Sequence, residues 1–178
     1  MKELNRCAPS VAHVDPRGVR ELFEALNELN CHQVMITRDN SVIAEGYWDP
    51  YKKGFIHITY SISKSFTCTA VGMAIDEGLL SEDDFVLRFF PDALPAQPCA
   101  NMEEMRVRHL LTMSTGVSNE RGTVDDEATW LNRFLYNYVD EEPGKRFCYN
   151  SGSTYVLGCI IRKVTGINVF DYLKPRLF

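Results

Sequence analysis

The sequence predicts a mixed α/β fold in which a short strand-forming region precedes a longer helical one. Residues 33–47 contain two runs rich in β-branched residues, separated by Asp39 and Asn40, which tolerate the positive φ of a tight turn. From residue 59 onward, apolar residues recur at intervals of three and four, as in helices that bury one face. We therefore expect an N-terminal helix and β-hairpin over residues 1–58 and a helical region over residues 59–178, both within one structural unit.

The first ordered element is expected to be an amphipathic helix. Asp15 is suited to cap its N-terminus, and Pro16 fits the first turn, where a backbone N–H is not needed. The apolar residues that follow share one face: Val19, Leu22, Phe23, Leu26 and Leu29. The hairpin, with strands at residues 33–38 and 41–47, comes next.

Turn signals then divide the helical region. A helix over residues 61–77 is expected to end at Gly78, and residues 81–84 resemble a capping box for a short helix that stops before Pro91. Residues 91–98 read as a loop. The remaining helices are expected over residues 107–113, 125–139 and 152–164, and residues 169–173 are expected to start another before the chain stops at residue 178.

Composition and charge exclude several classes of partner. The 178 residues are 45% hydrophobic, which supports a globular core, and 19 Lys and Arg against 24 Asp and Glu give a net charge of −5. We therefore expect no nucleic-acid partner. No apolar run approaches the roughly 20 residues that span a bilayer, so no membrane partner is expected. The first residues lack a secretory signal, which favours a cytoplasmic location unless an export signal was removed.

No metal-ligand set is visible in the sequence. The six cysteines form no C-x-x-C pair and are expected to be reduced, with Cys68 and Cys159 acting as small apolar residues inside helices. The four histidines, at positions 13, 32, 57 and 109, lack ligand-like spacing and are interpreted as structural or surface residues. Walker, G-x-G-x-x-G, H-E-x-x-H and G-x-S-x-G motifs are absent, which disfavours those enzyme classes.

Ser61 and Lys64 form an S-x-x-K motif at an expected helix start. Residues three apart lie on one helical face, with Cβ atoms about 5–6 Å apart, so the hydroxyl and the amine can meet. A serine hydroxyl is a weak nucleophile until a base takes its proton, and a lysine desolvated among apolar neighbours can be that base. Taken alone, the motif is also open to a simpler interpretation, a serine N-cap beside a solvated lysine.

A second polar segment, residues 147–158, stands at the entry to an apolar helix. It contains Tyr149 and several hydroxyl-bearing residues, among them Ser151. A helix entry of this kind points side chains toward a cleft, although Tyr149 by itself could be a packing aromatic.

Together these segments resemble the serine β-lactamase and penicillin-binding-protein superfamily, within it the class C-like serine hydrolases. Residues 61–66 are similar to the nucleophile helix of that family, residues 108–116 to its "LLTHTSG" segment, and residues 143–158 to its "PG..F.YSN..Y.LLG" segment, with the match continuing to Gly166. The segments occur in the family's order and cover most of residues 33–178.

The resemblance implies a partial β-lactamase/transpeptidase-like fold and a serine hydrolase that works through an acyl-enzyme, without metal or organic cofactor. By position, Ser61 is similar to the nucleophile, Lys64 to the base that helps to activate it, and Tyr149 to the tyrosine that shuttles protons to and from the leaving group. Ser151 stands where the family usually has the asparagine of its Y-x-N triplet, and is expected to bind substrate. The expected substrate is a small molecule or short peptide with an ester, amide or β-lactam carbonyl, and the cytoplasmic expectation favours an esterase, amidase or peptidase.

One family landmark is missing. The K-T-G or H-T-G motif, which the family carries on a strand beside the nucleophile, has no counterpart, because Ser114-Thr115-Gly116 belongs to the helical segment. The chain therefore resembles the N-terminal portion of a longer protein without its C-terminal strands. The family takes one oxyanion-hole N–H from that strand, and losing such a donor typically costs about 10²–10³ in rate.

Two further classes of function stay open. The chain could be a non-catalytic acyl- or ligand-binding module, or a truncated scaffold of the same superfamily. It could also be a helical interaction protein in which Ser61 is a cap and Lys64 a surface charge. The sequence does not specify an oligomeric state.

Overall fold

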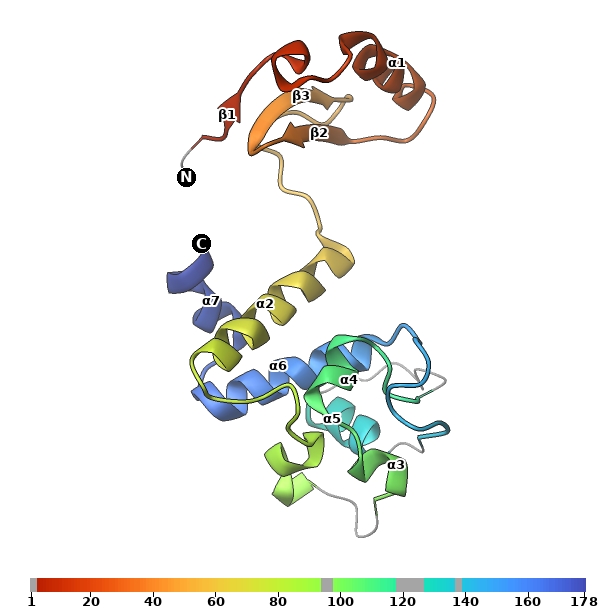
Figure 1. The fold of residues 1–178 in the computed structure, drawn as a ribbon, viewed down its shortest axis with the longest axis vertical. Coiled ribbons are helices and arrows are strands. Elements are labelled where there is room, and N and C mark those ends of the chain that lie inside the picture. Colours follow the sequence, from red (N-terminus) through yellow and green to blue (C-terminus); the bar gives the residue numbers. More distant parts are fainter. Residues whose placement is uncertain (1–2, 94–97, 118–126, 137–138) are drawn as a thin grey trace. The chain divides into compact units, whose positions relative to one another are not determined.

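The computed structural model describes residues 3–93, 98–117, 127–136 and 139–178. The chain forms two compact units, Met1–Ile58 and Thr59–Phe178 (Figure 1). In the described residues, seven α-helices accompany one small sheet, so the mixed α/β fold is confirmed.

The sheet of the N-terminal unit has three strands in the order β1-β3-β2. Strands β2 (Gln33–Arg38) and β3 (Ser41–Tyr47) form the antiparallel hairpin, and β1 (Asn5–Arg6), a strand not expected from the sequence, runs parallel to β3. Asp39 and Asn40 have φ angles of 48° and 59°, the left-handed conformation that a two-residue turn demands. The β-hairpin predicted for residues 33–47 is therefore confirmed.

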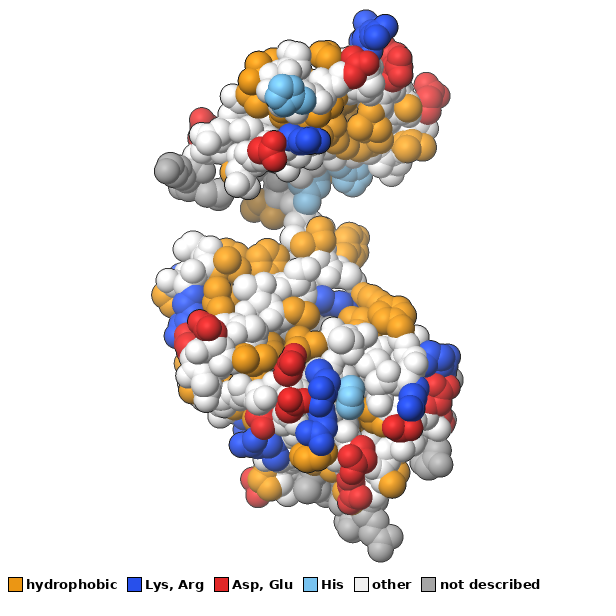
Figure 2. All heavy atoms as spheres, viewed as in Figure 1, with side chains coloured by type: hydrophobic (Ala, Val, Ile, Leu, Met, Phe, Trp, Pro, Cys, Tyr) orange, Lys and Arg blue, Asp and Glu red, His pale blue; other side chains and the backbone are white. Residues whose placement is uncertain are grey.

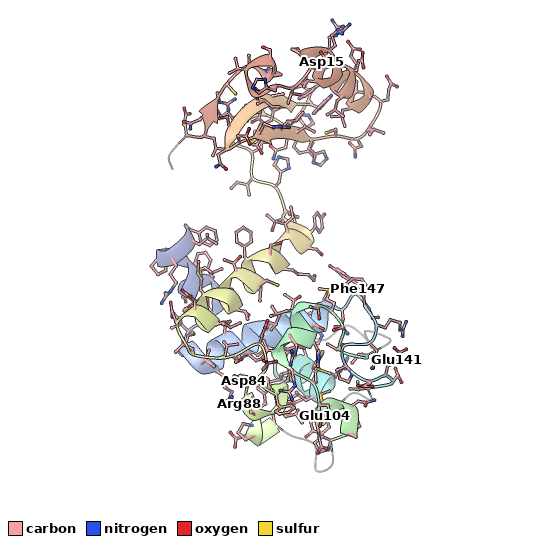
Figure 3. All side chains as sticks on the ribbon, in the orientation of Figure 1. Asp15, Asp84, Arg88, Glu104, Glu141 and Phe147 are labelled. Atoms are coloured by element: carbon pink, nitrogen blue, oxygen red, sulfur yellow. The ribbon has the colours of Figure 1, made fainter. Side chains whose placement is uncertain are left out.

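Helix α1 (Pro16–Leu26) begins as its cap predicts, because the Asp15 carboxylate accepts a hydrogen bond from Arg17 N at 2.9 Å (Figure 3). The Phe23 ring stacks on Trp48, with centroids 5.9 Å apart, and crosses Gly46, where a side chain would collide with that ring. The helix ends before Leu29, whose side chain is exposed because it lies past the last turn.

His32 and His57, far apart in sequence, lie close together in the N-terminal unit. Their ring centroids are 5.7 Å apart, and His32 stacks on Tyr51 at 3.8 Å. The described segments contain no group of three or more His, Cys, Asp or Glu side chains placed to hold a metal ion. The two histidines instead form an aromatic cluster with Tyr51. Their spacing in the sequence does not indicate this contact.

The C-terminal unit is built around α6 (Ser151–Thr165). Around it lie α2 (Ser63–Asp76), α4 (Val107–Leu111), α5 (Glu127–Leu135) and α7 (Val169–Leu177), each of which contacts it (Figure 1). The side chains that form the core between them are almost completely inaccessible to solvent. They include Ala70, Val71, Ala74, Leu110, Val156, Leu157, Ile160 and Ile161. Burial of this apolar surface is the main stabilising contribution in the unit.

Several element boundaries differ from the sequence prediction. The helix expected from residue 61 starts with a 3₁₀ turn, Tyr60–Ile62, and only then becomes α2. The short helix expected after residue 84 is another 3₁₀ turn, Val86–Phe89. A further 3₁₀ turn, Pro91–Ala93, and helix α3 (Ala100–Glu103) were also not expected.

The ends of helices α5 and α7 compare differently with the prediction. The prediction of α5 over residues 125–139 includes positions 125–126 and 137–138, which lie outside the described residues. Helix α7, expected to start over residues 169–173, does so and extends through Pro175 to Leu177. Arg176 holds this extension, because its guanidinium donates to Glu77 at 3.1 Å and to Tyr172 O at 3.0 Å.

Acidic and basic side chains are interspersed on the face of the helical unit in Figure 2. Arg88 pairs with Asp84, as Figure 3 shows, and Arg108 pairs with Asp83. Carboxylates therefore offset these arginines locally. No helix of the described segments is both long and apolar enough to cross a membrane.

We predict that Ile160→Ala lowers the free energy of unfolding of the helical unit by about 2–5 kcal/mol, because it leaves a cavity in the centre of the core. Urea titration followed by Trp130 fluorescence in a Trp48→Phe background reports on this unit alone. Ile167→Ala, at an exposed position, is the matched control and should change stability by less than about 0.5 kcal/mol. Equal losses in the two variants would contradict the packing described.

Candidate active site

Ser61 and Lys64 are brought together by the junction between a 3₁₀ turn and a helix. Ser61 lies in the turn Tyr60–Ile62, which is closed by a hydrogen bond from Ile62 N to Thr59 O at 3.0 Å. Lys64 is the second residue of α2. Because the chain keeps a helical course through the junction, the two side chains share one face, and Lys64 Nζ donates to Ser61 Oγ at 3.3 Å.

Tyr149 completes the cluster from a distant part of the sequence. Its hydroxyl lies 2.7 Å from Ser61 Oγ, and Lys64 Nζ lies 5.1 Å from the centroid of the Tyr149 ring. The hydroxyl of Ser61 is thus within hydrogen-bond reach of both a lysine and a tyrosine. The three residues that the sequence grouped by resemblance are together in space.

The loop that carries Tyr149 is fixed at both ends. Immediately after Tyr149, Asn150 caps α6 by accepting a hydrogen bond from Ser153 N at 3.1 Å. Immediately before it, Cys148 N donates to Met113 O at 2.8 Å. Phe147, labelled in Figure 3, precedes this anchor and remains exposed. The position of Tyr149 is therefore set by its two neighbours in the chain.

The segment after α4 supports the same loop. Gly144 N donates to Ser114 O at 2.7 Å, and Glu141 N donates to Gly116 O at 3.2 Å. Gly116 has a φ of 79°, and a side chain there would collide with the Glu141 carbonyl, so glycine is needed at this position. The Ser114-Thr115-Gly116 sequence, which resembles part of a family motif, supports the Tyr149 loop.

The surroundings of Tyr149 lower the pKa of its phenol below the ordinary value. The largest cause is the hydrogen bond with Ser61, and the next is a hydrogen bond with Lys64. The positive charge of Lys64 lowers the pKa further, because it stabilises the phenolate. Partial desolvation acts in the opposite direction, and a hydrogen bond with Ser151 adds a smaller lowering. Tyr149 therefore loses its proton more readily than an isolated tyrosine does.

A groove of about 880 Å³ in the helical unit opens beside this cluster. Lys64 and Ser151 belong to its lining, and farther along it lie the stacked rings of Trp130 and Tyr155, with centroids 4.7 Å apart. Ser151, expected to bind substrate, is the first residue of α6 and is half-buried. Its position joins the Tyr149 cluster to the groove, and its role in substrate binding stays a prediction.

Sequence reasoning assigned no role to Asn150 or Ser63. The signal for Asn150 was present, because asparagine directly before an apolar helical run is a preferred N-cap. The hydroxyl of Ser63 donates to Tyr60 O at 2.6 Å, a local bond that the S-x-x-K pattern alone does not indicate.

Comparisons with known proteins agree with this architecture. The Beta-lactamase family model matches residues 19–178, and the chain therefore belongs to the β-lactamase family. The chain is 26% identical, over 192 aligned positions, to a 6-aminohexanoate-dimer hydrolase from Paenarthrobacter ureafaciens, with 96% of this chain and 48% of that relative covered. The chain thus spans about half the length of that curated relative.

Solved structures show the same fold at lower identity. FmtA from Staphylococcus aureus superposes with a TM-score of 0.71 at 16% identity, covering 99% of this chain and 51% of that one. A β-lactamase/D-alanine carboxypeptidase from Pseudomonas syringae gives a TM-score of 0.68 at 21% identity, covering 90% and 47%. The partial β-lactamase/transpeptidase-like fold expected from the resemblance is confirmed.

We predict that Lys64→Met raises the pKa of Tyr149, because it removes both a hydrogen bond to the phenol and a nearby positive charge. The measurement is a pH titration of the tyrosine ring carbons by NMR, with the Tyr149 signal assigned from Tyr149→Phe. Lys145→Met is the control, since it removes the same charge from the surface loop, where Lys145 pairs with Glu142 at 3.6 Å. A Tyr149 pKa unchanged by Lys64→Met would show that the lysine does not act on the phenol.

Proposed function

We propose that this protein is a serine hydrolase that cleaves an amide or ester carbonyl through an acyl-enzyme on Ser61. The observation that carries the proposal is the position of Ser61 Oγ, 2.7 Å from the Tyr149 hydroxyl and 3.3 Å from Lys64 Nζ. A nucleophile within hydrogen-bond reach of a base, which is itself oriented by a third group, is the arrangement that covalent catalysis requires.

In the proposed acylation step, Ser61 Oγ bonds to the substrate carbonyl carbon while its proton passes to Tyr149. The lowered pKa of the phenol raises the fraction of Tyr149 that is already phenolate before the reaction, and it is this phenolate, stabilised by Lys64, that can take the proton. The bond from the carbonyl carbon to the leaving amine or alcohol then breaks, and Tyr149 returns the proton to that leaving group. In the second half of the reaction, the oxygen of a water molecule bonds to the acyl carbon while Tyr149 takes one of the water's protons. The bond from the acyl carbon to Ser61 Oγ then breaks, Tyr149 passes the proton to Oγ, and the carboxylic acid product leaves.

The activities named for several relatives support an amide or peptide substrate. Besides the 6-aminohexanoate-dimer hydrolase and the carboxypeptidase, one structural neighbour is a D-stereospecific amidohydrolase from Streptomyces, with a TM-score of 0.56. All are hydrolases, which supports a hydrolase role for this chain. We extend to it the proposal of a small amide, ester or short-peptide substrate, while a β-lactam remains the alternative for the same chemistry.

We predict that a fluorophosphonate probe adds once to the chain and that Ser61→Ala abolishes the adduct in intact-mass measurements. Lys64→Met should slow labelling by at least about 10²-fold, because without the lysine less Tyr149 is present as the phenolate that takes the serine proton, and a positioned proton acceptor contributes about 10²–10⁴. Ser65→Ala, which removes an exposed hydroxyl from the same helix, should label at the wild-type rate.

A parallel incubation with a penicillin separates the alternatives. Release of the acyl group supports the hydrolase, whereas a stable adduct on Ser61 without turnover supports a non-catalytic acyl-binding module. A folded wild-type chain that neither reagent labels would contradict an activated Ser61 in the 178 residues.

A further inference from the structure

We propose that Ser63 is a positioning residue, whose hydroxyl fixes the backbone of the turn that presents Ser61. The proposal rests on the proposed function of Ser61. Ser63 Oγ donates to the carbonyl oxygen of Tyr60 at 2.6 Å, and Ser61 lies between these two residues in the chain. The bond thus spans the proposed nucleophile without using its hydroxyl.

The backbone at Tyr60 needs such a restraint. Tyr60 has a φ of 44°, in the left-handed region that non-glycine residues rarely occupy unless the surroundings hold them there. Its own side chain is 79% exposed, so the packing of its ring contributes little. The Tyr60 carbonyl instead accepts hydrogen bonds from both the backbone N–H and the hydroxyl of Ser63.

Peptide planarity carries this restraint to Ser61. The Tyr60 carbonyl and the Ser61 N–H belong to one rigid peptide plane and point in opposite directions. When Ser63 holds the carbonyl oxygen, it therefore also sets the direction of the Ser61 N–H and the position of the Ser61 Cα. The distances from Ser61 Oγ to Tyr149 and Lys64 depend on that position.

The competing interpretation is that Ser63 only stabilises a helix start. Serine side chains often bond to nearby carbonyls, and such bonds contribute to folding without any effect on reactivity. A merely local bond would change the melting temperature and leave the chemistry of the Ser61 cluster as it is. The two interpretations differ in what happens to Tyr149, whose phenol pKa responds to its hydrogen bond with Ser61.

The test compares Ser63→Ala, Ser63→Thr and the control Ser65→Ala in the full chain. Two readouts are used: the pKa of Tyr149 from NMR titration of the tyrosine ring carbons, and the rate at which a fluorophosphonate labels Ser61. In Ser63→Ala we expect the pKa of Tyr149 to rise and labelling to slow at least about tenfold, since small misplacements of reacting groups cost up to about 10² in rate. Ser63→Thr, which keeps the hydroxyl, should restore both values, and Ser65→Ala should change neither.

The pKa readout keeps the two proposals separate. If wild type is not labelled, the proposed function fails, and the Tyr149 titration still decides the role of Ser63. An unchanged Tyr149 pKa in folded Ser63→Ala would overturn the positioning role, even if the melting temperature falls. A folded Ser63→Thr that leaves the Tyr149 pKa as high as in Ser63→Ala would also overturn it, because the hydroxyl would then not be the cause.

Discussion

The packing of α6 against α2 is the constraint on which the candidate site depends. Ser61 and Tyr149 are 88 residues apart, and each lies two residues before the start of one of these two helices. The helices meet through small and branched side chains, with Ala70 and Ala74 on α2 and Ile160 on α6 fully buried. Because apolar burial fixes the helices against each other, it also brings their N-terminal ends, and the polar groups there, into one place.

The site is held by backbone bonds more than by its own polar contacts. The Ser61, Lys64 and Tyr149 cluster is solvent-accessible, with Tyr149 itself 52% exposed, and exposed polar contacts stabilise a fold weakly. The loop before α6 is instead anchored through main-chain groups near Gly116, and the turn before α2 is closed by the bond from Ser63 N–H to the Tyr60 carbonyl. The reactive side chains are therefore positioned by rigid neighbours, which leaves their hydroxyl and amino groups available for chemistry.

Much of this arrangement could be predicted from the sequence because its signals are local. The turn residues Asp39 and Asn40 specified the hairpin, and Asp15 with Pro16 specified the start of α1. Local patterns of this kind carry their own stereochemical reason, so they persist in the fold. The grouping of residues 61, 64 and 149 in one site follows instead from the resemblance to the β-lactamase superfamily.

What the sequence did not reveal depends on contacts between distant residues or on unusual backbone. The extension of α7 through Pro175 involves a hydrogen bond from Arg176 to Glu77, which lies at the end of α2. The contacts of His32 with Tyr51 and His57 likewise join residues that are distant in the sequence. The 3₁₀ turn at Ser61 has a helical sequence pattern, and it differs from the first turn of α2 by its three-residue hydrogen bonds and by the positive φ of Tyr60. Periodicity does not report such angles.

The most direct test of the central claim is to locate the acyl group during hydrolysis. The chain is quenched in acid while it hydrolyses a p-nitrophenyl ester, and peptide mass mapping identifies the acylated residue. The account predicts one acyl group on Ser61 that disappears as the ester is consumed, with no acylation in Ser61→Ala. An acyl group on Lys64, Tyr149 or a cysteine, or ester hydrolysis that persists in Ser61→Ala, would contradict it.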